Sequence, residues 1–440
     1  MDVNGILLLY FHPLFLSAPT LTENIHSFAR ESEFKVWEVN TLFGFPEGLE
    51  GLRFRCVVLH YSLFDPWGYR LCERFLSYLE RSPSSYKVAF FQDEYHYCRQ
   101  RFAFLNRYKI DCVYTLVEPA YFKDVYRKYT SVPKLIYHIP GYVSDDLVAT
   151  AKRLTRPEER RTIDIGYRGQ RLPFYMGKGA QEKFEIAAAF RERVRGSGLK
   201  TDIEADPSKR IYGPAWYEFL ANCRAVLGVE AGVSVYDIDD VVRAEWERLS
   251  AENPDITFEE LSRRLLCRWE SNIPYRTISP RHFEAAALRV CQILFEGKYS
   301  GVMQPMVHYI ALRKDFSNFE EVIGLIRDEG LRREMTERAY RDLIASGRYS
   351  YRSFVRGFDE ELRQSAAISP DVSSKEAARV TSLLRKGGAR RYVRAWAEHK
   401  RVMRWVGVVR GYPFPGRETL KSVLKGQKRR PGDETPAGRP

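Results

Sequence analysis

The chain has 440 residues, of which 44% are hydrophobic and 14% aromatic, and it carries a formal net charge of +13. A chain of this length is too long to fold around one ordinary hydrophobic core, so we expect two domains with additional segments. The hydrophobic content excludes an intrinsically disordered protein. The charge is uneven, because residues 371–440 hold 18 Lys and Arg against 6 Asp and Glu, a net +12, and the remainder is almost neutral.

The seven cysteines are scattered and include no CxxC pair. Several, such as Cys56 and Cys112, lie in apolar runs. The sequence therefore predicts buried free thiols in a reducing compartment rather than a disulfide or zinc framework. The apolar stretch 5–18 contains His12 and Pro13, follows no basic residue, and is too short to span a bilayer. We expect a cytoplasmic protein.

Residues 1–140 alternate short apolar runs with helical patterns. Strands are expected at 6–12, 34–40, 56–60, 87–92, 110–116 and 134–138, and helices at 20–31 and 69–81. This alternation predicts a doubly wound parallel sheet, in which ligands gather at the carboxyl ends of the strands.

Polar side chains follow several of these strands, namely His12, His60, Asp93, Glu94 and His138. Asp93 and Glu94 are the strongest functional candidates, because two acidic groups come directly after a buried strand. Polar residues occur at strand ends in any α/β domain, so a structural role remains the alternative for each.

Residues 143–160 are polar and charged and are expected to form an interdomain linker. A second α/β unit begins with a strand at 162–169. It continues through a loop containing Arg171 and Lys178 to a helix at 181–195, with Lys183 in its first turn. Further strands are expected at 200–204 and 224–230, a helix at 216–222, and a helical insert at 238–270 with a capping box from Thr257 to Glu260.

The stretch 278–297 predicts a short helix leading into a buried strand. Ser279 is a good N-cap, Pro280 suits the first helical position, and residues 290–295 form a largely apolar run. The free amides near Arg281 and His282 favour an anion before the helix. Glu284 lies one turn further on, where a carboxylate accepts hydrogen bonds from a ribose whose diphosphate rests on the helix start.

Residues 281–297, RHFEAAALRVCQILFEG, resemble the donor-binding segment of GT-B-fold glycosyltransferases of the "glycosyl transferases group 1" kind, which include the CgeB spore-protein-like domains. The family usually has Gly where Arg289 stands and Pro where Cys291 stands. The resemblance extends over about 158–352 and more weakly over 1–140. It implies an α/β GT-B fold, with two Rossmann-like domains facing a cleft and a basic helical tail. The implied segments are an acceptor domain at 1–142, the linker 143–160, a nucleotide-sugar domain at 161–352, a crossover helix at 353–365 and the tail at 366–440.

The resemblance also implies an activity, the transfer of a sugar from a nucleotide-sugar donor to a saccharide, lipid or protein acceptor. Such relatives usually retain anomeric configuration and need neither a metal nor a cofactor. By this resemblance Glu284 holds the ribose, and Arg168 with Lys178 or Lys183 grips the diphosphate. The other expected donor-binding residues are Ser279, Arg281, His282 and Tyr299.

The catalytic residues are less directly implied. Many relatives carry a second glutamate before the ribose glutamate, and it contacts the transferred sugar, but the matching position here is Arg276. We therefore expect Glu230 to take that role, separated from Glu284 by the insert. Retention would need no protein base, whereas inversion would need one, with Asp93 and His12 as candidates.

The basic tail leaves several alternatives open. Residues 389–410 form a basic amphipathic pattern that fits an anionic membrane surface, nucleic acid or a partner groove, or a helix packed on the enzyme. The almost neutral body argues against nucleic acid. A second function also remains open, a catalytically silent GT-B-like binding or scaffold protein that the tail recruits to an assembly at the inner face of the membrane.

Overall fold

The first sheet contains six parallel strands in the order β2-β1-β3-β4-β5-β6. Its central strands are buried on both faces, which explains continuous apolar runs such as that of β1. The strands are β1 (Asp2–Tyr10), β2 (Val36–Asn40), β3 (Arg53–Leu59), β4 (Tyr86–Phe90), β5 (Cys112–Thr115) and β6 (Lys134–Tyr137), and the helices are α1 (Pro19–Glu31), α2 (Glu73–Glu80) and α3 (Cys98–Arg107).

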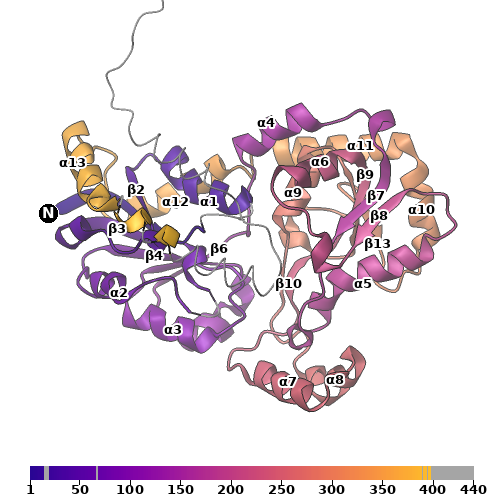
Figure 1. The fold of residues 1–440 in the computed structure, drawn as a ribbon, viewed down its shortest axis with the longest axis horizontal. Coiled ribbons are helices and arrows are strands. Elements are labelled where there is room, and N and C mark those ends of the chain that lie inside the picture. Colours follow the sequence, from indigo (N-terminus) through magenta and orange to yellow (C-terminus); the bar gives the residue numbers. More distant parts are fainter. Residues whose placement is uncertain (14–18, 66–67, 389, 394, 398–440) are drawn as a thin grey trace, which may run out of the picture. The chain divides into compact units, whose positions relative to one another are not determined.

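The second sheet contains five parallel strands in the order β13-β12-β9-β7-β8. Figure 1 shows helices flanking the strands of both sheets. The strands are β7 (Ile163–Arg168), β8 (Thr201–Glu204), β9 (Cys223–Gly228), β12 (Cys291–Phe295) and β13 (Ile310–Leu312). The helices are α5 (Lys178–Arg193), α6 (Pro214–Asn222), α9 (Pro280–Ala287), α10 (Phe319–Arg327) and α11 (Glu329–Ala339).

These elements come from a computed structural model that describes residues 1–13, 19–65, 68–388, 390–393 and 395–397. Both sheets have a doubly wound topology, because the chain moves from the first strand to one neighbour and then crosses to the other side. The switch points lie between β1 and β3 and between β7 and β9, where ligands of such sheets bind beyond the carboxyl ends. Two Rossmann-like units of this kind agree with the GT-B fold class that the sequence predicts.

Two chain segments that join the sheets are hydrogen-bonded to each other. Val143 donates its N–H to Tyr349 O at 2.8 Å and accepts from Tyr351 N at 3.0 Å. The predicted linker 143–160 contains helix α4 (Asp145–Leu154), which Ser144 caps. Helix α12 (Tyr351–Ser365) returns to the first sheet, where Val355 and Phe358 join its core.

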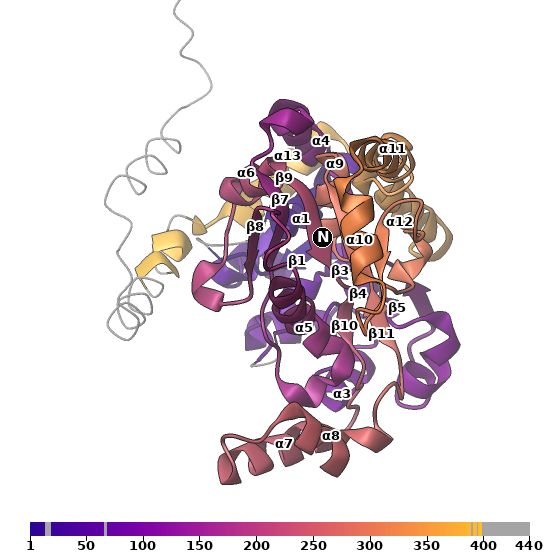
Figure 2. The ribbon, with the colours of Figure 1, turned by 90° about the vertical axis from the view of Figure 1, so that its right-hand side faces the viewer.

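The predicted insert is helical, with α7 (Val241–Glu252) and α8 (Phe258–Arg264) standing apart from both sheets in Figures 1 and 2. These helices form a small core of their own around Val242 and Leu261. The Thr257 half of the predicted capping box is confirmed, because Thr257 Oγ1 accepts from Glu260 N at 3.2 Å. Two antiparallel strands that the sequence analysis did not predict, β10 (Ala231–Val233) and β11 (Tyr275–Thr277), hold the two ends of the insert together.

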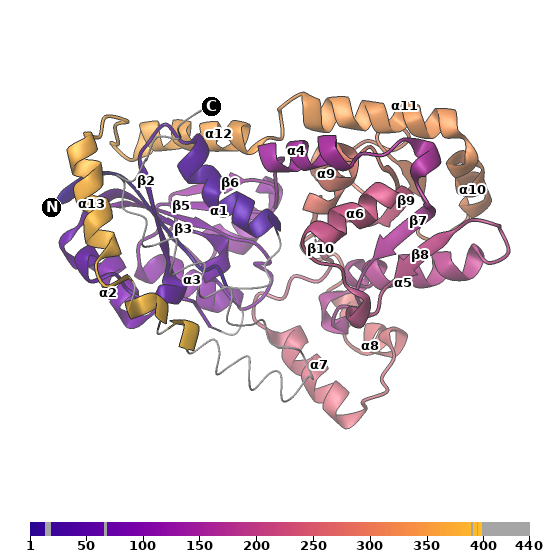
Figure 3. The same ribbon diagram turned by 45° about the horizontal axis from the view of Figure 1, so that its top comes forward.

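The first part of the predicted tail belongs to the folded body. Helix α13 (Ser374–Arg385) lies beside the first sheet in Figure 3 and buries Val380 and Leu384 in its core. Thr381 Oγ1 also accepts from Trp37 Nε1 at 3.2 Å. The tail therefore separates from the compact unit only after Lys386, rather than at 366. Most of the predicted amphipathic segment 389–410 lies outside the described residues.

Most of the cysteines are buried, as their apolar sequence context predicts. Five of the seven cysteines are buried free thiols, whereas Cys72 and Cys267 are exposed. Arg289 has a left-handed backbone (φ 52°), a conformation that favours glycine, and its guanidinium lies 3.6 Å from the centroid of the Tyr340 ring. None of the described helices is long and apolar enough to cross a bilayer.

Candidate functional site

A cavity of about 380 Å³ opens at the switch point of the second sheet. The carboxyl ends of β7 and β9 line it, together with the start of α9 and the loop before α6. This size is typical of a small-molecule site. Six of the residues predicted to bind the donor contribute to the lining, namely Arg168, Lys183, Ser279, Arg281, His282 and Glu284.

The start of α9 is fixed by a reciprocal cap. Ser279 donates its N–H to His282 Nδ1 at 3.0 Å, and His282 N donates to Ser279 O at 3.1 Å. Burial lowers the pKa of His282 to about 4, which keeps the ring neutral and able to accept. Pro280 has no N–H, so the cap leaves fewer free amides at this terminus than the sequence predicts.

Glu284 is a buried carboxylate in the cavity wall, only 5% exposed. Its Oε2 accepts from Trp216 Nε1 at 2.6 Å. Burial raises the pKa of Glu284, and the Trp216 hydrogen bond and the Arg281 charge oppose that rise. A carboxylate in this position can accept further hydrogen bonds from hydroxyl groups in the cavity.

Lys183 supplies a cation to the same cavity. Within the described residues no hydrogen bond or ion pair is recorded for its ammonium. Burial lowers the pKa of Lys183, the Asp93 carboxylate opposes this shift, and Arg276 and Arg281 add to it. A partly buried ammonium of this kind is stabilised by an anionic ligand.

Lys178, the other predicted diphosphate residue, is exposed at the start of α5 and does not line the cavity. The first amides of α5 already have partners from the protein. Lys178 N donates to Glu270 Oε2 at 3.1 Å, and Gly179 N donates to Ser234 Oγ at 2.7 Å. The geometry therefore favours Lys183 for the anionic part of a ligand.

The guanidinium of Arg168 is largely committed to protein groups. It pairs with Asp202 Oδ2 at 2.8 Å and donates to the carbonyls of Tyr167 and Lys209. Arg281 is exposed, donates to Arg168 O, and places its guanidinium 4.9 Å from the centroid of the Trp216 ring. Of these two arginines, Arg281 is the more accessible to a ligand.

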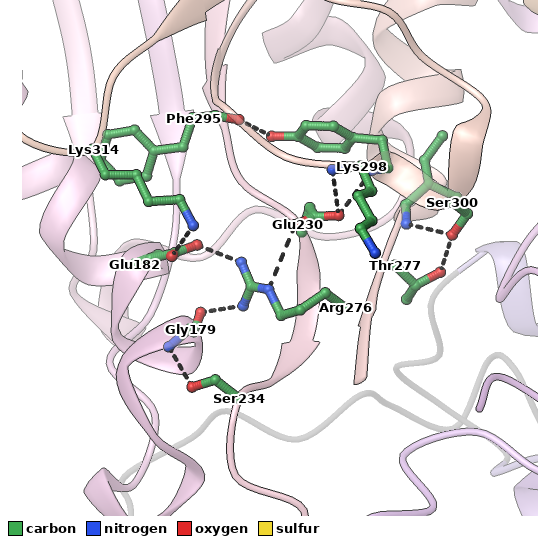
Figure 4. Close-up of polar contacts among 12 residues, drawn as sticks. Gly179, Glu182, Glu230, Ser234, Arg276, Thr277, Phe295, Lys298, Ser300 and Lys314 are labelled. Atoms are coloured by element: carbon green, nitrogen blue, oxygen red, sulfur yellow. Dashed lines mark hydrogen bonds and ion pairs between the residues drawn. The ribbon is translucent and has the colours of Figure 1, made fainter. Parts of the chain in front are cut away.

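Glu230 does not line this cavity, although the sequence predicts that it contacts the sugar. It is 6% exposed, and its Oε1 accepts from Lys298 N at 3.1 Å and Tyr299 N at 2.8 Å (Figure 4). A Cβ on Gly297 would lie 2.7 Å from the carboxylate, so only glycine leaves room for it there. Glu230 thus organises the loop that follows β12.

Arg276 connects Glu230 to a second carboxylate. Its Nε lies 3.7 Å from Glu230 Oε2, and its other nitrogens donate to Glu182 and to Gly179 O (Figure 4). Lys314 Nζ pairs with Glu182 Oε1 at 2.7 Å. Two carboxylates and two cations therefore form a closed network in which each charge has an opposite partner.

Tyr299, predicted to bind the donor, is completely buried and also lies outside the cavity lining. Its hydroxyl donates to Phe295 O at 2.7 Å. The ring packs edge-on against His282, with centroids 5.1 Å apart. Its contact with the site is therefore indirect, through His282.

The polar residues at the carboxyl edge of the first sheet have different environments. His12 Nε2 lies 2.8 Å from Thr22 Oγ1, and Asp93 is exposed with a left-handed backbone (φ 52°).

Glu94 is buried and accepts from Leu116 N at 2.8 Å, as well as from Thr115 and Tyr126. His60 hydrogen-bonds with Asn24 and Ser62, and burial lowers its pKa to about 3. His138 lies among the rings of Phe90, Tyr114 and Phe354.

The sequence analysis assigned no role to three residues that line the cavity, namely Arg210, Tyr212 and Trp216. Trp216 was expected only as the start of a helix, and its hydrogen bond to Glu284 joins segments 68 positions apart. A metal site would need several His, Cys, Asp or Glu side chains close together, and the sequence analysis expects none. Among the residues described, no group of three or more His, Cys, Asp or Glu is arranged to hold a metal ion.

No protein-family model matches the chain. No curated protein matches it either. Several solved structures do. HepE of Anabaena, in complex with UDP-glucose, aligns with a TM-score of 0.44 and 10% identity over 82% of this chain and 99% of that protein.

Two further structures are similar. A glycosyltransferase from Rickettsia africae aligns with a TM-score of 0.41 and 10% identity over 83% of this chain and 100% of that chain. TarM of S. aureus gives 0.36 and 11% over 69% of this chain, which spans 53% of the TarM chain. These similarities are of structure, at sequence identities of 10% and 11%.

Proposed function

We propose that this chain is a nucleotide-sugar-dependent glycosyltransferase that moves a sugar to a saccharide, lipid or protein acceptor. The observation that carries this proposal is the buried Glu284 carboxylate in the same cavity as the Lys183 ammonium. A hydrogen-bond acceptor for hydroxyls next to a cation suits a ribose followed by a diphosphate. A cavity at the switch point of a parallel sheet supports the same proposal.

In this proposal each side chain has a definite role. Glu284 orients the ribose through its hydroxyls. Lys183 and Arg281 offset the negative charge that builds on the leaving diphosphate, which is the main electrostatic demand of the reaction. Lys183 is partly buried beside the cavity, which strengthens this effect relative to water, whereas Arg281 is exposed and contributes less.

The acceptor is proposed to bind at the carboxyl edge of the first sheet. Asp93 is exposed there, and its carboxylate opposes the lowering of the pKa of Lys183, a residue that lines the donor cavity. Retention would need no protein base. Inversion would require one, and Asp93 is then a better candidate than His12, which hydrogen-bonds with Thr22.

One observation favours a second function, a catalytically silent binding or scaffold protein. Arg276 stands at the position of the family's sugar-contacting glutamate, and Glu230 is engaged by loop amides rather than by the cavity. In this alternative the protein binds a nucleotide sugar but transfers nothing. The tail, with a net charge of +10 over residues 387–440, would then recruit it to an anionic membrane surface.

A thermal-shift screen against nucleoside diphosphates and nucleotide sugars tests the proposal. Saturating ligand at a hundred times its dissociation constant stabilises the fold by about 2.7 kcal/mol. Binding followed by hydrolysis or transfer of the sugar supports the enzyme. Binding with no turnover supports the scaffold, and no shift with any nucleotide contradicts both.

A further inference from the structure

A nucleobase would need an aromatic or apolar surface near the ribose site. Three aromatic side chains line the cavity, Tyr167, Tyr212 and Trp216. Tyr167 is 7% exposed and donates its hydroxyl to Lys183 O at 2.9 Å, so its ring is part of the core. The remaining question is which of the other two rings has a free face.

The Trp216 ring is already engaged by the protein. Phe219 stacks on it with centroids 5.6 Å apart and planes inclined by 27°, and the Arg281 guanidinium lies 4.9 Å from its centroid. Its indole N–H is used by Glu284. Trp216 therefore orients the carboxylate of Glu284, and its ring has little surface left for a base.

Tyr212 is different, because its side chain is 56% exposed at the cavity. Five large apolar side chains among the described residues are exposed, by 41% to 58%, and of these Tyr212 is the one that lines the cavity. Its recorded ring contact is with the Arg210 guanidinium, 5.6 Å from the centroid. Tyr212 lines the same cavity as Trp216, whose indole N–H donates to Glu284.

We propose that Tyr212 forms the stacking platform for the nucleobase of the ligand, with Arg210 beside it. This inference rests on the proposed function, since it assumes a nucleoside diphosphate with its ribose at Glu284. Stacking on an aromatic ring is tolerant of sequence because every base has a π face. Tyr212 should therefore add affinity for all bases without selecting among them.

The test compares the nucleoside diphosphate that gives the largest thermal shift with inorganic diphosphate and ribose 5-phosphate, which lack a base. Stacking on an aromatic ring contributes an amount equivalent to about 5- to 150-fold in affinity. Tyr212→Ala should weaken the nucleoside diphosphate by this factor, as measured by calorimetry, and leave both base-free ligands unchanged. Tyr212→Phe and Tyr212→Trp should retain wild-type affinity, because the ring face remains.

Val241→Ala provides the matched control, since Val241 is 53% exposed at the start of α7 and does not line the cavity. Unchanged nucleoside diphosphate affinity in Tyr212→Ala would overturn the stacking role while leaving the proposed function in place. Equal losses for ligands with and without a base would overturn it too, because they would indicate a general distortion of the cavity. A wild-type protein that binds no nucleotide would instead contradict the proposed function itself.

Discussion

Replacing Glu284 with glutamine tests the proposed ribose contact directly. The side chain keeps its size, and its carbonyl oxygen can still accept from Trp216 Nε1, which now donates at 2.6 Å. The change removes the negative charge that ribose hydroxyls would contact. Because burial already raises the pKa of Glu284, the neutral amide should not destabilise the fold.

The expected loss follows from the chemistry of the contact. Hydrogen bonds to a charged group contribute roughly 1.5–3 kcal/mol, which corresponds to about 10- to 150-fold in affinity. Calorimetry with the nucleoside diphosphate that gives the largest thermal shift should show Glu284→Gln binding weaker by this factor. Inorganic diphosphate, which has no ribose, should bind both proteins equally.

A ligand cycle separates the contact from indirect effects. The 2′-deoxy form of the nucleotide lacks one hydroxyl and should bind the wild-type protein more weakly. If Glu284 accepts a hydrogen bond from that hydroxyl, the deoxy ligand should lose much less binding free energy with the glutamine variant than with the wild-type protein. The losses caused by the two changes are then not additive. Additive losses, or an unchanged affinity for the ribonucleotide, would remove Glu284 from the ribose site.

Three further changes have definite expected outcomes. Lys183→Ala should weaken diphosphate binding at least tenfold in calorimetry, whereas Lys178→Ala should have no effect; equal losses would contradict the choice between them. Burial raises the pKa of Glu23 to about 7, so the folded state holds this proton between pH 4.5 and 7 and stability falls as the pH rises through that window. Glu23→Gln should raise the unfolding free energy at pH 8 by up to roughly 3 kcal/mol and leave it unchanged at pH 4, and a pH-independent effect in chemical denaturation would refute this. Deleting 387–440 should preserve the melting temperature and abolish salt-sensitive flotation with anionic vesicles, whereas equal flotation of both proteins would exclude a membrane role for the tail.

The sequence predicted the parts of the fold that depend on local patterns. The Ser279-Pro280 start of α9 and the apolar run of β12 are clear because capping and burial act on neighbouring residues. Strands β10 and β11 were missed because each has three residues and they pair across the insert. Helix α13 was assigned to a separate tail, since its charge was visible and its partners in the first sheet were not.

The site was harder to predict because its contacts join distant segments. Glu230 stands at the carboxyl end of β9 as expected, but the amides that engage it lie almost 70 residues later. Lys178 and Lys183 could not be separated in the sequence. Both lysines lie on α5, but in the structure only Lys183 lines the cavity at the carboxyl ends of β7 and β9.

The starts of α5 and α9 have different capacities to bind a phosphate. The first amides of α5 are taken by Glu270 and Ser234, so this terminus has little capacity left for a phosphate. The first turn of α9 faces the cavity, but the backbone amides of Ser279 and His282 already donate to each other's residue, and Pro280 has no N–H. The partial positive charge of α9 remains, yet most of the direct hydrogen bonds to a diphosphate must come from side chains. We therefore expect Lys183 and Arg281 to carry more of the proposed anion binding here than side chains would in a site where a helix start supplies several free amides.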